Sequence, residues 1–167
     1  MIRKRNGKLL RMAQNGTIGT SFACATETII GSVDLPADFL ISGAIILIRA
    51  NFIKTGTSSQ ITLKLYFNTT ESLSGALLLA TGGSPTTTDL SPYIYRTFCF
   101  DSSTTAKGMN STFNSFFDYG ESSTTVVSFS FTNWLVNGGK FFITGIRGAG
   151  TDTIQSLGIT IEVWIQK

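Results

Sequence analysis

ITLKLYF, residues 61–67, is the clearest strand in this sequence. Apolar residues occupy every second position of the stretch, and Thr, Lys and Tyr stand between them. Successive side chains of a strand point to opposite faces of a sheet, so this alternation predicts one face in the core and one in water or at an interface. The same period of two recurs in residues 127–132 and 157–166, which predicts two more half-buried antiparallel strands.

Residues 44–54 differ, because both faces of this segment are apolar from Ile45 to Ile48. Such a strand is predicted to lie centrally in its sheet, covered on both sides. Residues 73–80 are predicted to form a short helical turn. Further strands are predicted over residues 18–24, 28–33, 93–101, 111–119 and 140–147. About nine short strands separated by turns predict an all-β fold, a jelly-roll-like antiparallel β-sandwich of about 8–10 strands.

The basic side chains are concentrated at the start of the chain. Met1 to Arg11 contain five of the thirteen Lys and Arg residues and no Asp or Glu. The rest of the chain contains eight Lys and Arg and ten Asp and Glu, which gives it a net charge of −2. With the Asn15-Gly16 turn signal that follows, this predicts a short basic N-terminal arm, residues 1–16, before a single β-sandwich domain, residues 17–167. The arm is interpreted as a docking element, and its candidate docking residues are Arg3, Lys4, Arg5, Lys8 and Arg11.

The residues of common catalytic and metal sites are scarce. The chain has no histidine, which removes the usual general base of Ser and Cys nucleophiles and the commonest metal ligand. Cys24 and Cys99 form no CxxC spacing and are interpreted as buried free thiols, with a bridge between them as the less favoured alternative. The chain is therefore predicted to be no enzyme and to use no metal and no cofactor. No signal peptide or membrane span is predicted.

Two groups of aromatic residues are candidates for an interface. Trp164 falls on the polar face of the last predicted strand, beside Glu162 and Gln166. Residues 112–119 contain aromatics that strict alternation cannot send to one face, so another chain or a long loop is expected to bury some of them. The alternative is an irregular strand tucked under its own loops. The candidate interface aromatics are Phe113, Phe116, Phe117, Tyr119 and Trp164.

Three stretches carry a family resemblance: residues 19–23, 43–57 and 65–81, with the KTGT turn at 54–57 and the NTTESLSGA loop at 68–76 as their most specific parts. They resemble a β-sandwich domain of virion structural proteins of tailed bacteriophages. The resemblance covers roughly residues 17–167 and implies the outer, often trimeric module of head fibres, decoration proteins and tail appendages. It implies no shared catalytic motif. The short leader before the domain favours a compact decoration, head-fibre or collar component.

The expected function is therefore that of a non-enzymatic structural component of a bacteriophage virion. The expected partners are two further copies in a homotrimer and other virion proteins of the capsid or the tail and portal region. The expected location is the virion, after synthesis in the host cytoplasm. One alternative is a glycan- or receptor-binding module for host attachment. The other is a small-virus coat protein with an RNA-binding arm, although five charges without interleaved aromatics make nucleic acid the less favoured partner.

Overall fold

The computed structural model describes residues 7–39, 41–81, 91–102, 105–109, 126–130, 137–148 and 150–166. Every named element in these ranges is a strand. The strands are β1 (Gly7–Asn15), β2 (Thr28–Leu35), β3 (Ile45–Thr55), β4 (Ile61–Asn68), β5 (Leu77–Thr81), β6 (Tyr93–Phe100), β7 (Thr105–Met109), β8 (Val126–Ser130), β9 (Gly139–Arg147) and β10 (Thr153–Gln166). No helix in the described part of the chain is long and apolar enough to cross a membrane.

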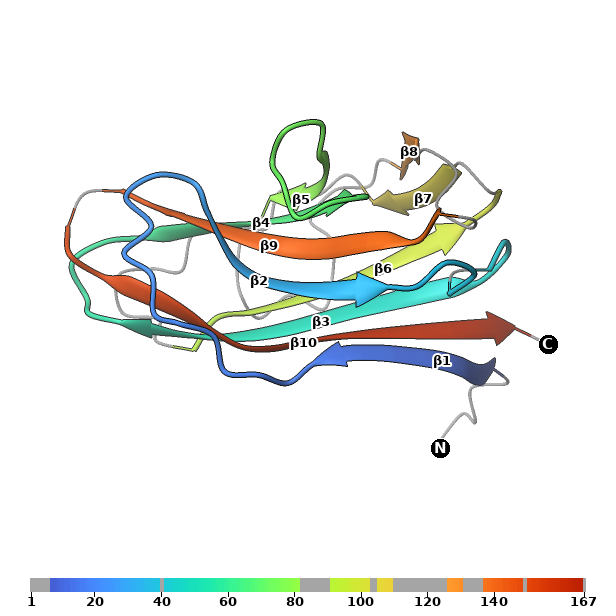
Figure 1. Ribbon diagram of the computed structural model, residues 1–167, viewed down its shortest axis with the longest axis horizontal. Helices are drawn as coiled ribbons and strands as arrows, with labels where there is room; N and C mark the ends of the chain where they lie inside the picture. Colours follow the sequence, from blue (N-terminus) through green and yellow to red (C-terminus); the bar gives the residue numbers. More distant parts are fainter. Residues whose placement is uncertain are drawn as a thin grey trace.

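The strands form two antiparallel sheets that pack face to face (Figure 1). Over the described residues, one sheet has the order β1-β10-β3-β6-β7-β8 and the other has the order β2-β9-β4-β5. The predicted all-β sandwich is thus confirmed. The jelly-roll connectivity stays a prediction.

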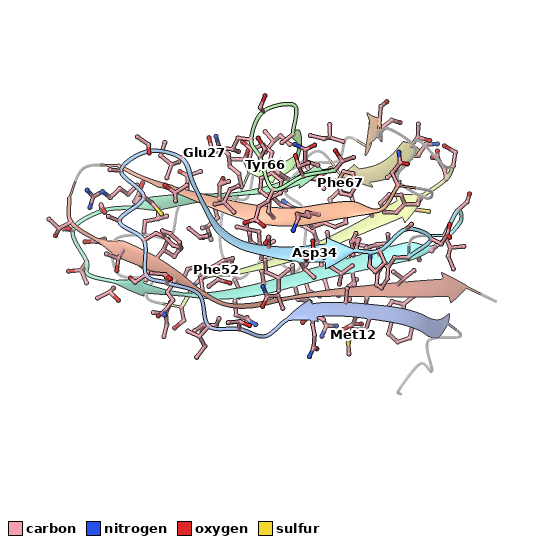
Figure 2. All side chains as sticks on the ribbon, in the orientation of Figure 1. Met12, Glu27, Asp34, Phe52, Tyr66 and Phe67 are labelled. Atoms are coloured by element: carbon pink, nitrogen blue, oxygen red, sulfur yellow. The ribbon has the colours of Figure 1, made fainter. Side chains whose placement is uncertain are left out.

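The core lies between the two sheets and follows the alternation of the sequence. Ile61, Leu63 and Leu65 of β4 are fully buried there, and Phe67 packs edge-on against Phe141 of β9 with ring centres 5.1 Å apart. The opposite sheet contributes the inward-facing residues Ile46, Ile48, Ala50 and Phe52 of β3. Figure 2 shows Phe52 and Phe67 inside the sandwich.

The central position predicted for residues 44–54 is confirmed. β3 lies between β10 and β6, and Ile46, Leu47 and Ile48 are all buried although consecutive residues face opposite sides of a sheet. From Arg49 onward exposed and buried residues alternate, because only one face of the strand remains covered.

Two of the predicted local structures are wrong. Residues 18–24 were predicted to form a strand, yet Phe22 alone makes an isolated bridge, to Ile154, and Cys24 has a φ of 49° that departs from extended backbone. Residues 73–80 form no helical turn: Gly75 adopts a φ of 73°, and the following residues enter strand β5, which pairs with β4. The strand predicted over residues 111–119 lies outside the described residues.

The N-terminal region differs from the predicted separate arm. Residues 7–15 of the predicted arm 1–16 form β1, which pairs with β10 from Gly7 opposite Gln166 to Asn15 opposite Ile159. Figure 1 shows β1 alongside β10 at the border of the six-stranded sheet. Charged residues suit such an edge, where they discourage unwanted pairing with other chains. The basic segment is therefore, from residue 7 onward, a part of the sandwich.

Candidate interaction surface

The outer face of the six-stranded sheet gathers an aromatic and charged patch, here called the outer patch: Met12, Arg49, Tyr95, Glu162 and Trp164. These residues come from four neighbouring strands, β1, β3, β6 and β10. The register places Met12 opposite Glu162 and Arg49 opposite Tyr95, and residues directly opposite each other share a face. Segments far apart in the sequence therefore form one surface.

Four side chains of the outer patch contact one another in a row: Trp164, Glu162, Arg49 and Tyr95. Trp164 Nε1 donates a hydrogen bond to Glu162 Oε2 at 3.0 Å, and Arg49 Nη1 lies 3.6 Å from Glu162 Oε1. The Arg49 guanidinium also lies over the Tyr95 ring, 5.5 Å from its centre, within the range of a cation–π interaction. Glu162 is 14% exposed, whereas Arg49 is 50% exposed.

This arrangement suits binding to another macromolecule. Trp, Tyr and Arg are the residues that most often dominate the binding energy of interfaces. Trp164 is half-buried with its indole N–H satisfied, which fixes its ring, and Met12 is 54% exposed at the side of the patch. The predicted position of Trp164 beside Glu162 on the outer face is confirmed, while its contact with another chain stays a prediction.

The other predicted site residues are placed only in part. Lys8 and Arg11 lie in β1, opposite Ile165 and Val163, although the described side chains begin at Met12. Leu9 is opposite Trp164, so the basic segment and the predicted interface tryptophan occupy neighbouring strands. The remaining predicted site residues, Arg3, Lys4, Arg5, Phe113, Phe116, Phe117 and Tyr119, lie outside the described residues.

The KTGT turn is fixed by a buried ion pair. Lys54 Nζ lies 2.9 Å from Asp152 Oδ2, with both side chains at most 1% exposed, and donates to the carbonyl of Gly56 at 2.7 Å. Asp152 also accepts hydrogen bonds from the Ser58 hydroxyl and from the Ser59 amide, the latter at 2.9 Å. The bond from Ser58, opposed by burial and reinforced by Lys54, holds the pKa of Asp152 well below its usual range. These contacts tie the turn after β3 to the segment before β10.

The NTTESLSGA loop is likewise held by its own polar side chains. Asn68 Nδ2 donates to the carbonyls of Ser72 and Ser74 at 2.8 and 3.1 Å. Glu71 accepts a hydrogen bond from the Ser32 hydroxyl at 2.8 Å, and Lys140 lies 3.5 Å away. The two most specific motifs of the family resemblance therefore close turns.

A third polar cluster lies on the outer face of the four-stranded sheet. The Glu27 carboxylate accepts hydrogen bonds from Lys64 at 2.9 Å, Tyr66 at 2.8 Å and Thr144 at 2.8 Å. Burial alone would raise the pKa of Glu27, but the three hydrogen bonds outweigh it and lower that pKa. Burial and the bond to Glu27 raise the pKa of Tyr66, so its phenol stays protonated at neutral pH. The cluster joins the segment before β2 to β4 and β9, as the proximity of Glu27 and Tyr66 in Figure 2 illustrates.

The two cysteines occupy different environments, and both are free. Cys24 is buried, and this burial raises the pKa of its thiol to about 11. Cys99 is exposed, which corrects the prediction that both thiols are buried. In β6, alternation sends Cys99 to the outer face, the side opposite the buried residues Phe98 and Phe100.

Within the described residues, no group of three or more His, Cys, Asp or Glu could hold a metal ion. Comparison of the chain with protein-family models, with curated proteins and with solved structures finds no match. The outer patch and the β1 edge are therefore interpreted from their own residues.

Proposed function

We propose that this chain is a non-enzymatic structural component of a bacteriophage virion, attached to the particle through its basic N-terminal segment. The observation that carries the proposal is the position of β1. This strand belongs to the segment with five Lys and Arg and no acid, and it lies at the border of a sheet, where a partner can reach it. The resemblance of the KTGT and NTTESLSGA motifs to motifs of phage virion proteins is the reason for proposing that the particle is a phage virion.

A structural role is also consistent with the polar clusters. The Lys54–Asp152 pair, the Asn68 loop and the Glu27 cluster each join two segments of the chain, and the sequence supplies no histidine to act as a general base. We propose that the outer patch forms a contact between copies in a homotrimer. Light scattering coupled to size-exclusion chromatography tests this, since Trp164→Ala and Arg49→Ala should shift trimers toward monomers. A monomer at all concentrations overturns the trimer.

The virion assignment is tested on purified particles. An antibody against the chain should label intact virions in electron micrographs, and the purified protein should bind particles that lack it. Neutralising Arg3, Lys4 and Arg5 together to Gln should weaken this binding, because it removes three of the five N-terminal charges. Lys107→Gln, which removes an exposed charge on β7, is the control and should bind normally. Unlabelled virions would refute the assignment.

Glycan binding is the second candidate, because Tyr95 and Trp164 lie on the outer face beside the charged side chains of Arg49 and Glu162. Aromatic rings next to polar groups stack on sugars as well as on proteins. A glycan array with the purified chain tests this use, with Tyr95→Ala as the matched variant. Binding to a defined glycan that Tyr95→Ala abolishes would favour receptor attachment, whereas an empty array would leave only the structural role.

A further inference from the structure

The border strand β1 has one edge without a strand partner in the described part of the chain. It pairs with β10 on one side, and among the described residues no strand of the six-stranded sheet lies beyond its other side. The unpaired backbone N–H and C=O groups of such an edge are a template for an added strand. Recognition by strand addition takes affinity from these main-chain groups and specificity from pockets for alternate side chains.

A groove next to this edge supplies such pockets. It has a volume of about 440 Å³ and lies between β1 and β2, the border strands of the two sheets. Ala13, Val33 and Phe39 give it apolar walls. Lys140 pairs with Asp34 at 2.5 Å and with Glu71 at 3.5 Å beside them, so the three charged side chains of the lining carry a net charge of −1. The apolar walls of the groove therefore fit apolar side chains of an extended segment that runs along β1.

We propose that an extended, acid-rich segment of another virion protein adds to β1 as a further strand of the six-stranded sheet and places alternate apolar side chains in the groove. This inference rests on the proposed attachment function and names the partner of the same segment. Residues 1–11 carry five positive charges and no negative one, so an acidic strand is attracted to them. The N-terminal segment of a second copy carries the same five positive charges, which opposes pairing between copies.

The test uses two blocked peptides of about ten residues, the length of a typical long strand. One alternates Val with Glu and the other alternates Val with Lys. Hydrogen exchange of the backbone amides is followed in the full chain with each peptide. At about ten times its Kd, the acidic peptide should slow exchange about tenfold in residues 7–15. The Lys peptide should give no protection.

Charge variants separate strand addition from general attraction. Lys8→Glu with Arg11→Glu lowers the charge of residues 1–11 from +5 to +1 and should remove most of the preference for the acidic peptide, whereas Lys8→Gln with Arg11→Gln leaves +3 and should only weaken it, provided that thermal unfolding shows both variants folded. Lys107→Glu, on β7, should keep the preference for the acidic peptide. Protection outside β1, equal protection by both peptides, or none at all would overturn the proposal.

Failure of strand addition can be distinguished from failure of the proposed attachment function. If virions bind the chain through its N-terminal charges while the acidic peptide leaves β1 unprotected, strand addition is wrong and attachment stands. If virions fail to bind the chain, both proposals are wrong.

Discussion

Gly145 lies in β9 opposite Thr28 of β2, and replacing it with alanine should destabilise the fold. A Cβ atom at this position would lie 3.1 Å from Cys24 Sγ, 3.3 Å from Ile154 Cγ2 and 3.6 Å from Ile30 Cδ1. The first two separations are shorter than ordinary van der Waals contact, and all three neighbours are buried. Overpacking of this kind typically costs about 1–3 kcal/mol. At roughly 2–4 °C per kcal/mol for a chain of this size, Tm should fall by several degrees.

Urea unfolding followed by tryptophan fluorescence measures the free energy of unfolding of each variant. Gly16→Ala is the control, because nothing lies within 4 Å of its added Cβ, and it should change stability by less than about 0.5 kcal/mol. Cys24→Ala removes the sulfur atom that the new methyl group meets. The double variant Gly145→Ala with Cys24→Ala should therefore lose less stability than the two single variants combined, by about 1 kcal/mol. Purely additive losses, or a Gly145→Ala variant as stable as the parent, would refute the packing described for this layer.

Three further predictions follow from the titratable groups. Because burial raises the pKa of Cys24 to about 11, its thiolate is scarce at pH 8, so iodoacetamide should label Cys99 quickly and Cys24 only after unfolding; fast labelling of two thiols in the native chain would contradict this. Asp152 has a lowered pKa in the folded state, so its stabilising contribution is present above the unfolded value near 3.9 and lost as the pH falls below it. Calorimetry should show Tm falling in acid, with a weaker pH dependence in Asp152→Asn. Glu27→Gln should weaken the bonds from Lys64 and Tyr66 and lower stability by about 1–2 kcal/mol at pH 7, whereas an unchanged urea midpoint would show that this cluster contributes little.

Sequence periodicity predicted those strands whose alternation of apolar and polar residues can be read within one short segment. β4 and β10 alternate without interruption over most of their length, and the apolar start of β3 requires cover on both faces. β1 was missed because its basic residues resemble a solvated arm and because a register shift between Leu9 and Arg11 breaks its alternation. Residues 18–24 were predicted to form a strand, yet only Phe22 makes a bridge, and Cys24 leaves the extended backbone at the end of the segment.

The candidate site depends on information that no single segment contains. The outward direction of Trp164 followed from the alternation of the last strand. Its surroundings did not, because Arg49 and Tyr95 reach the same face only through the register of β10 with β3 and of β3 with β6. The order of strands in a sheet is set by long-range pairing, which local periodicity does not report.

The pairing of β1 with β10 also orders events during synthesis. Gly7 precedes its partner Gln166 by most of the described sequence, so β1 cannot enter the sheet until β10 has been made. Until then the basic segment has no strand to pair with, whereas β4, β5 and β9 of the other sheet need no residue after Arg147 and can form first. A product truncated before β10 would therefore leave this basic strand unpaired.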